Sequence, residues 1–377
     1  MNQKQKQIQR DGEERFARFV FLFLILEAGL LVFLLTAHLW PKRWTWGGTF
    51  GDPGDETGNI SGELTTPEDT ETQPPVTVPV FSGGVLPTRP TANGNTQVLG
   101  TEVISNYALL VDTQTGAIVA SKNGNTRFSP ASMTKVMTLI VACENLTEED
   151  LERKLVLTQE LHNYSHSGNY WDSSAAGFDV DDEIKIKDLL YGIGVKSASD
   201  CTAMIVFDLC GSEEAFVSLM NQKAEQMGLT NTHFDNAIGY ESENNYTTAT
   251  EMAMILSYAL QSPLIKDILG VKSYAFEAYY YNEGVYDSYG FAYYSTLFVG
   301  RMENYQEHSN KKFSLATSTL EAGKTGALDS SFLACQAKAK NGDRYVLILG
   351  DATGSSLKLA CYFTMKDVKH ILDTYVP

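Results

Sequence analysis

The chain has 377 residues, of which 43% are hydrophobic, so it can form one large core or two smaller ones. Its formal net charge is −17. This balance argues against a nucleic-acid-binding protein, because the chain has no basic patch with interleaved aromatic residues. The negative charge does not by itself identify a partner.

An apolar stretch from Phe19 to Trp40 predicts a transmembrane helix. It is long enough to cross a bilayer, which takes about 20 residues, and few polar residues, Glu27 among them, interrupt it. A cleaved signal peptide is the alternative, but its apolar core would be shorter and no small-x-small cleavage site precedes Trp40. Lysine and arginine are concentrated in residues 1–18, which predicts a cytoplasmic tail, a membrane anchor over residues 19–40 and an exported domain.

The composition of residues 41–100 predicts a disordered linker. The segment is rich in Gly, Thr, Pro, Asp and Glu, and it contains no Lys or Arg from Gly47 to Thr88. Such a stretch buries too little apolar surface to offset the entropy lost on ordering. We expect an extended, self-repelling tether, followed by one folded domain over residues 101–377.

The folded domain is expected to begin and end with strands. Tyr107–Val111 and Ala117–Ala120 are apolar runs joined by a turn-forming segment. Near the C-terminus, Phe332–Ala337 and Tyr345–Leu349 flank Asn341-Gly342, a strong hairpin signal. Helical patterns cover Ile186–Tyr191, Cys201–Leu209, Glu213–Met227, Thr250–Leu260 and Lys366–Tyr375. This order predicts an α+β fold whose antiparallel sheet combines N- and C-terminal segments.

Ser132 and Lys135 form a candidate catalytic pair. Ser129 and Pro130 indicate a helix start, which places Ser132 in the first turn, where backbone N–H groups lack intrahelical partners. Lys135 lies on the same face of the helix, and the apolar run after it predicts a buried helix. A lysine in a dry site has a lowered pKa and can take the proton of a serine hydroxyl. We therefore expect Ser132 to be a nucleophile and Lys135 to be its base.

A Ser-x-x-Lys motif alone occurs by chance about once in a chain this long, so its companions decide its meaning. A second motif, Ser197-Ala198-Ser199-Asp200, precedes a predicted helix, and a third, Gly323-Lys324-Thr325-Gly326, precedes a predicted strand. Together the three motifs resemble those of penicillin-binding proteins and serine β-lactamases. The resemblance is closest to the D-alanyl-D-alanine carboxypeptidases and runs from about Tyr107 to the C-terminus. Further matching segments are Asp112–Gly116, Pro130–Lys135, Asp188–Gly192, Met220-Asn221 and Gly228–Thr232.

The resemblance implies a role for each matching side chain. In that family the first serine is the nucleophile and its lysine the base, which corresponds to Ser132 and Lys135. The serine of the second motif passes a proton toward the leaving amine, which corresponds to Ser197. The lysine and threonine of the third motif receive the terminal carboxylate of the substrate, which corresponds to Lys324 and Thr325. Repulsion from Lys324 is expected to lower the pKa of Lys135.

The backbone near these residues is expected to complete the site. The resemblance implies an oxyanion hole made of the backbone N–H groups of Ser132 and Ala327. This requires that the side chain of Ser129 does not occupy the Ser132 N–H as a helix cap. Gly326 is expected to leave room for the substrate backbone beside the strand.

Two features depart from the family pattern. Ser199 stands where the family usually has an asparagine that contacts the first lysine and the substrate. We expect this substrate-binding position to give weaker or altered turnover without loss of acylation. The other departure is a tyrosine-rich insertion at Ser273–Phe298. It is either an aromatic hairpin that packs on the domain or a lip near the cleft that binds glycan or a partner.

These observations predict a serine-type D-Ala-D-Ala carboxypeptidase tethered to a bacterial membrane. The resemblance implies a DD-peptidase-like α+β fold, with an antiparallel sheet flanked by helices and an all-helical subdomain. It also implies that the substrate is a peptidoglycan stem peptide, that β-lactam antibiotics are covalent inhibitors, and that neither a metal nor a cofactor is needed.

Two alternative functions are considered. A β-lactamase is disfavoured because no convincing Glu-x-x-x-Asn deacylation motif occurs. A catalytically impaired protein that binds or scaffolds the cell wall is favoured by Ser199 and by the tyrosine-rich insertion. The intact Ser132, Lys135, Ser197 and Lys324 argue against it.

Overall fold

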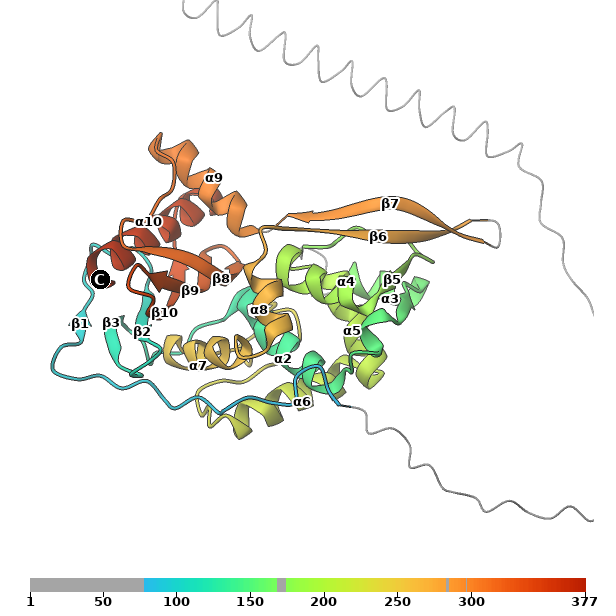
Figure 1. Cartoon of the computed structure of the whole chain (residues 1–377), viewed down its shortest axis with the longest axis horizontal. Coiled ribbons are helices and arrows are strands. Elements are labelled where there is room, and N and C mark those ends of the chain that lie inside the picture. Colours follow the sequence, from blue (N-terminus) through green and yellow to red (C-terminus); the bar gives the residue numbers. More distant parts are fainter. Residues whose placement is uncertain (1–77, 168–173, 283–284, 296) are drawn as a thin grey trace, which may run out of the picture. The chain divides into compact units, whose positions relative to one another are not determined.

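The structure, a computed structural model, describes residues 78–167, 174–282, 285–295 and 297–377 (Figure 1). The transmembrane helix expected at Phe19–Trp40 and most of the expected linker lie outside these ranges. Within them, no helix has both the length and the hydrophobicity that a bilayer-spanning segment requires.

The main sheet has six strands in the order β1-β3-β2-β10-β9-β8. Strand β2 near the start of the domain pairs antiparallel with β10 near its end, so the predicted union of N- and C-terminal segments is confirmed. Strand β1 runs parallel to β3, and the other neighbours in this sheet are antiparallel. The strands are β1 Gln97–Val98, β2 Tyr107–Asp112, β3 Ile118–Lys122, β8 Ser318–Ala327, β9 Ser331–Ala339 and β10 Arg344–Ala352.

Helices cover both faces of this sheet, because successive strand residues point to opposite sides. In β2, Ala108 and Leu110 pack in one core with α10, Leu357–Tyr375, while Leu109 and Val111 pack in the other core with α2 and α7. Helix α9 packs against α10, and Figure 1 shows the two together beside the sheet. The bounds are α2 Lys135–Asn145, α7 Ala249–Ala259 and α9 Leu297–Ser309.

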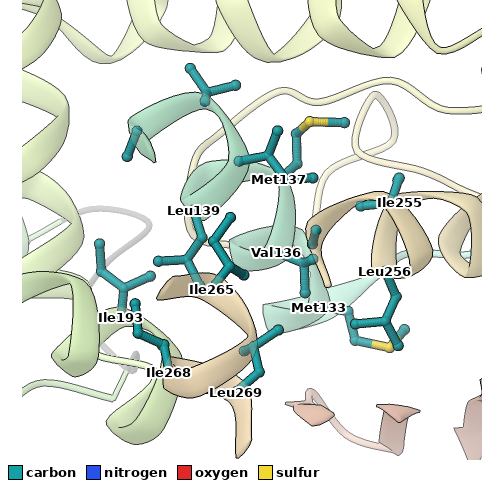
Figure 2. Close-up of a cluster of buried hydrophobic side chains, with 14 of the residues drawn as sticks. Met133, Val136, Met137, Leu139, Ile193, Ile255, Leu256, Ile265, Ile268 and Leu269 are labelled. Carbon is teal, nitrogen blue, oxygen red and sulfur yellow. The ribbon is translucent and has the colours of Figure 1, made fainter. Parts of the chain in front are cut away.

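Helix α2 lies at the centre of the larger core, as its apolar sequence predicts. Its residues from Lys135 to Cys143 are all buried. Figure 2 shows the side chains of Val136 and Leu139 among residues of α7, of α8, Pro263–Gly270, and of the turn at Ile193. A charged group at the start of such a helix is therefore removed from water.

The second part of the domain differs from the expected all-helical subdomain. It has the helices α3 Gln159–Ser165, α4 Ile186–Tyr191, α5 Ser199–Cys210 and α6 Glu213–Gln226. It also has a four-stranded antiparallel sheet, formed by β4 Lys154–Val156, β5 Glu183–Lys185, β6 Ser273–Asn282 and β7 Val285–Ser295. The expectation was wrong in this respect, because strands as short as β4 and β5 have too few residues to show the alternation of apolar and polar side chains that predicts a strand.

The tyrosine-rich insertion forms the hairpin β6–β7, in agreement with the hairpin interpretation. Its base packs on the domain, where the ring of Tyr274 stacks on Tyr191 with 3.6 Å between ring centroids. The Tyr274 hydroxyl also donates a 2.7 Å hydrogen bond to Asp188 in α4. Figure 1 shows the rest of the hairpin as a long two-stranded ribbon. A role in binding glycan or a partner stays a prediction.

Residues 78–100, which were assigned to the linker, are packed against the domain. The backbone N–H of Phe81 donates to the carbonyl of Cys143 at 2.9 Å, and the Phe81 side chain is buried. Farther along, Arg89 forms an ion pair with the buried Glu251, and β1 adds a strand to the sheet beside β3. The ordered domain therefore includes this segment.

Candidate active site

Ser132 lies in a short 3₁₀ turn, Ala131–Thr134, that leads directly into α2. Ala131 has a positive φ of 49°, which is uncommon for a residue other than glycine. The Ser129 hydroxyl makes no hydrogen bond within the described part of the chain. It therefore leaves the Ser132 N–H unoccupied by a side-chain cap, as the predicted oxyanion hole requires.

Lys135 is held against Ser132 in a dry environment. Its Nζ lies 3.3 Å from Ser132 Oγ and donates a 2.7 Å hydrogen bond to the carbonyl oxygen of Ile238. The residue is 1% exposed. Burial disfavours the charged ammonium and lowers the pKa of Lys135 to about 7. A substantial fraction of the amine is therefore neutral near pH 7 and able to accept a proton.

Lys324 forms a second contact in the site, with Ser197. Its Nζ lies 2.9 Å from Ser197 Oγ and 2.9 Å from the carbonyl oxygen of Thr325. Burial, followed by repulsion from Lys135 and Arg301, holds the pKa of Lys324 well below its usual range. The expectation that Lys324 lowers the pKa of Lys135 is not met: burial is the cause of that shift, and the repulsion between the two lysines lowers the pKa of Lys324 instead.

Ser197 is presented by an unusual turn at the end of α4. A π-helical turn, Gly192–Lys196, continues α4, and Ser197 follows it with a left-handed backbone at φ 62°. Gly194 in this turn faces α8 so closely that a Cβ would lie 2.2 Å from Cγ2 of Ile268. Turns of this kind recur at functional sites, where they redirect one side chain.

Ser199 is separated from the cleft although it belongs to the second motif. It is the first residue of α5, is fully buried, and does not line the cleft. Its N–H donates to the carbonyl of Ser174 at 2.7 Å, while its Oγ has no partner among the described residues. The next residue, Asp200, accepts hydrogen bonds from the N–H groups of Ala176 and Gly177 and so fixes the neighbouring loop.

Strand β8 forms the wall opposite Ser197 and carries the third motif. Thr325, Gly326 and Ala327 line the cleft, whereas Lys324 is 1% exposed and reaches the site behind them. A Cβ on Gly326 would lie 3.1 Å from the Cβ of Ala131. Gly326 therefore allows the strand to lie close to the Ala131–Thr134 turn, which is a packing role beyond the expected room for substrate.

These residues surround one cleft of about 850 Å³. The structure brings Ser132, Lys135 and Ser197 together with Thr325–Ala327 on its walls. A loop that includes Ile238–Glu241 and residues of α9 and α10 complete the lining. The cleft is open to solvent on one side and buried at Lys135, which suits a site that admits a peptide and activates a serine.

Gly239 was missed by the sequence analysis and lies directly against the turn Ala131–Thr134 that holds Ser132. Its φ is +82°, and a Cβ would lie 1.8 Å from the carbonyl oxygen of Ala131 and 2.9 Å from the backbone nitrogen of Ser132. The Asn236 side chain accepts hydrogen bonds from the N–H groups of Gly239 and Tyr240 at 2.7 and 2.9 Å. A single glycine in a loop gives no distinctive signal, because its neighbour lies a hundred residues away in sequence.

Arg301 was also missed, since no helix was predicted where α9 lies. Its guanidinium is buried, donates to the carbonyl of Gly326 at 2.7 Å and to the Ser331 hydroxyl, and lines the cleft. No acidic side chain among the described residues pairs with it. Arg301 thus fixes the third-motif strand and adds positive charge to the cleft.

A family model described as D-alanyl-D-alanine carboxypeptidase matches residues 92–340. The chain belongs to this family. The match covers all three motifs, so the resemblance found in the sequence is confirmed at the level of the family.

Curated relatives agree with this assignment. The chain is 29% identical to the D-alanyl-D-alanine carboxypeptidase DacF of Bacillus subtilis over 245 residues, 63% of this chain and 54% of the relative. It is 31% identical to DacA of Escherichia coli K12 over 149 residues, 39% of this chain and 37% of the relative. The chain thus spans about half, or less, of the length of these relatives.

Solved structures share the fold. The Streptomyces K15 DD-transpeptidase superposes with a TM-score of 0.58 at 20% identity, over 71% of this chain and 96% of that one. Penicillin-binding protein 5 from Haemophilus influenzae superposes with a TM-score of 0.55 at 22% identity. The superposition covers 72% of this chain and 70% of that one. At such identities the likeness establishes the mixed α+β architecture, with a sheet flanked by helices, as predicted.

Proposed function

We propose that this protein is a serine-type D-Ala-D-Ala carboxypeptidase that trims the terminal D-alanine from peptidoglycan stem peptides. The observation that carries the proposal is the contact of a buried lysine amine with Ser132 Oγ in the lining of an open cleft. A buried amine with a lowered pKa is the base that a serine nucleophile needs. The family to which the chain belongs, named for this activity, supports the same function.

The acylation step follows from the positions of the side chains. Ser132 Oγ attacks the carbonyl carbon of the bond between the two D-alanines while Lys135 takes the hydroxyl proton. The carbonyl oxygen becomes an oxyanion, for which the N–H groups of Ser132 and Ala327 are the proposed donors. The C–N bond then breaks, and the amine of the leaving D-alanine receives a proton through Ser197, which Lys324 contacts. Water later hydrolyses the ester and restores the Ser132 hydroxyl.

The cleft is suited to a substrate that ends in a carboxylate. Lys324 and Arg301 are buried near Thr325, and no acidic partner neutralises either of them within the described part of the chain. A terminal carboxylate at Thr325 would be attracted by the Arg301 guanidinium, and its negative charge would favour the protonated form of Lys324. A β-lactam also carries a carboxylate beside a reactive amide, so we propose that penicillins acylate Ser132.

The exported location is part of the proposal. Residues 19–40 would form a single-pass membrane anchor, with residues 1–18 in the cytoplasm and the domain outside. The acidic linker would hold the cleft at a distance from the lipid surface, where the cell-wall peptides are.

Release of D-alanine tests the proposed function. We expect the domain from residue 73 onward to release D-alanine from a peptide that ends in D-Ala-D-Ala. It should release no alanine from the same peptide ending in D-Ala-L-Ala, because the cleft is chiral and the terminal residue is held at its carboxylate. A folded domain that binds the first peptide without cleaving it would contradict the proposal and favour the wall-binding alternative.

The wall-binding alternative has one specific observation in its favour, which is Ser199. Its hydroxyl is buried and unpartnered, so it does not contact Lys135 as the family's usual asparagine does. The β-lactamase alternative predicts rapid turnover of penicillin in place of a long-lived acyl-enzyme. Mass spectrometry of the domain after exposure to penicillin distinguishes these outcomes.

The pH dependence of acylation should follow Lys135. Protonated Lys135 cannot accept the serine proton, and its pKa is lowered to about 7. The acylation rate should therefore be constant above about pH 7, where Lys135 is neutral. Below about pH 7 the rate should fall about tenfold for each unit by which the pH is lowered. Stopped-flow measurement with a penicillin that does not titrate in this range gives the profile. A rate that is independent of pH, or that falls as the pH rises, would exclude Lys135 as the base.

Replacing Ser199 with asparagine should raise turnover. Helix α5, which begins at Ser199, packs against α2, which begins at Lys135. A carboxamide extends farther than a hydroxyl and carries both a donor and an acceptor, so it can reach from α5 toward α2 where the Ser199 hydroxyl does not. We expect kcat for the D-Ala-D-Ala peptide to increase about tenfold in Ser199→Asn. Ser199→Leu, which adds similar volume without a polar group, is the matched control. An equal effect of the two changes on kcat would contradict this explanation.

A further inference from the structure

A free thiol lies in the lining of the cleft and takes no part in the mechanism proposed above. Cys361 belongs to α10, which packs against α9, and its side chain is partly exposed and forms no disulfide. Of the five cysteines, all of which the structure describes, it is the one that lines the cleft. A small molecule that enters the cleft can therefore meet this thiol.

Asn304 of α9 lies one helical turn from Cys361 and has an unused acceptor. Its Nδ2 donates a 2.6 Å hydrogen bond to the carbonyl of Lys358, three residues before Cys361. Asn304 lines the cleft and is 8% exposed, and its buried Oδ1 accepts no hydrogen bond from the described residues. A buried carbonyl oxygen without a donor is costly, which indicates that a ligand supplies an N–H or ammonium group there.

Arg301 reaches the following turn of α10 and has an unused positive charge. It donates to the Ser331 hydroxyl, which also accepts a 2.5 Å hydrogen bond from Thr364, three residues after Cys361. Burial lowers the pKa of Arg301, while negative charge at Cys361 acts to raise it, so the two groups lie within electrostatic range. Arg301 has no acidic partner among the described residues. An unpaired, buried guanidinium indicates that a ligand supplies a carboxylate.

We propose that Cys361 is a modification site that captures one half of a zwitterionic amino-acid disulfide, of which cystine is the simplest. The carboxylate of that half would pair with Arg301, and its ammonium would donate to Asn304 Oδ1. The Cys361 thiolate attacks one sulfur of the disulfide, and the S–S bond breaks. Cys361 is thereby oxidised to a mixed disulfide, while the other half leaves reduced, as a thiol that takes up the proton released by Cys361.

The modification would close the cleft to substrate. A cysteinyl group on Cys361 would fill part of the cleft that Ser132 also lines, and its carboxylate would occupy the Arg301 guanidinium. Disulfides persist outside the cell, where the domain is proposed to lie, and an added thiol would reverse the reaction. Activity would therefore depend on the redox state of the surroundings. This consequence rests on the proposed function, whereas the modification itself does not.

Three disulfides that differ only in the two recognised groups test the site. Cystine carries both groups, cystamine lacks the carboxylates, and dithiodipropionate lacks the ammonium groups. The full-length protein is treated with each, and mass spectrometry of its peptides gives the modification rates of Cys361 and of Cys210. Cys210, which is partly exposed at the end of α5 and does not line the cleft, corrects for the intrinsic reactivity of each reagent.

We expect the ratio of the Cys361 rate to the Cys210 rate to be about tenfold higher for cystine than for cystamine, because hydrogen bonds to charged groups are the strong ones. The ratio for dithiodipropionate should also be lower than that for cystine. Arg301→Gln should remove the advantage of cystine over cystamine, and Arg301→Lys, which keeps the charge, should retain part of it. The comparison of the three reagents on the wild type stands even where these variants fail to fold.

Two results would overturn the proposed site. One is an equal ratio for all three reagents, because Cys361 would then be an exposed thiol without a binding site. The other is a Cys361 that stays unmodified while Cys210 reacts. A disulfide-linked dimer that is absent in Cys361→Ser would also overturn it, and would assign the thiol to a contact between two copies of the chain.

The effect on activity is measured separately. Treatment with cystine should abolish labelling of the wild type by a fluorescent penicillin, and dithiothreitol should restore it. Cys361→Ser should be labelled to the same extent before and after cystine. If the wild type is modified at Cys361 and is labelled as before, the closing of the cleft is contradicted. If the untreated wild type is never labelled, the proposed function fails, and the modification rates still decide the site.

Discussion

Ser132→Ala should abolish covalent labelling of the domain by a fluorescent penicillin. Ser132 is the proposed attachment point of the acyl group, because Lys135 Nζ lies 3.3 Å from its Oγ and can take the hydroxyl proton. Loss of an enzyme's nucleophilic serine typically lowers kcat by a factor on the order of 10⁴ to 10⁶. Release of D-alanine should therefore fall to background in this variant.

Gel fluorescence after incubation with the labelled penicillin measures the effect. Ser218→Ala, at an exposed position of α6 away from the cleft, should label like the wild type. The melting temperature of Ser132→Ala should stay close to the wild-type value, which shows that lost labelling is not lost folding. Persistent labelling of Ser132→Ala would show that another residue is the nucleophile. A folded wild type that is never labelled would favour the wall-binding alternative.

Gly239→Ala should inactivate the site although Gly239 takes part in no bond-making step. A Cβ at this position would lie 1.8 Å from the carbonyl oxygen of Ala131, a distance that no relaxed structure permits. The Ala131–Ser132 peptide or the Gly239 loop must therefore move. Displacing a reacting group by about 1 Å can cost about 10² in rate. We expect the acylation rate of Gly239→Ala to fall by at least about 10².

The matched control for this change is Gly228→Ala. Gly228 also has a positive φ, +71°, but a Cβ there meets nothing within 4 Å. Both variants add left-handed strain of about 1–2 kcal/mol, and only Gly239→Ala adds a clash with the Ala131–Thr134 turn. Gly228→Ala should lose stability in thermal denaturation and keep its acylation rate. If both folded variants acylate at the wild-type rate, Gly239 does not position Ser132.

Hydrophobic pattern and turn chemistry were sufficient to predict the local elements. Helix α4 was predicted with the bounds that the structure has, and the strands β2 and β10 differ by only a few residues. The closing helix α10 begins nine residues before the predicted start at Lys366, because its first turns carry exposed residues that weaken the apolar pattern. The strand β8 was not predicted, since its glycines and its lysine interrupt the alternation of a strand.

The three motifs that contain Ser132, Ser197 and Lys324 could be found in the sequence because each is a short local pattern that a known family shares. Their meeting in one cleft depends on contacts between distant segments. The Lys135 amine donates a hydrogen bond to the carbonyl of Ile238, 103 residues away in the chain. The Lys324 amine donates one to the hydroxyl of Ser197, 127 residues away. No local signal marks Ile238 as the acceptor of the Lys135 amine.

The sequence by itself therefore determined the family, the motif residues and the local strands and helices, because each depends on neighbouring residues. Only the tertiary structure decided that Ser199 is buried and does not line the cleft, and that Arg301 lines it. It also placed Gly239 and Gly326 against the Ala131–Thr134 turn. The reason is physical. Burial, close approach of backbones and the electrostatic environment of a side chain arise between segments that only the folded chain brings together.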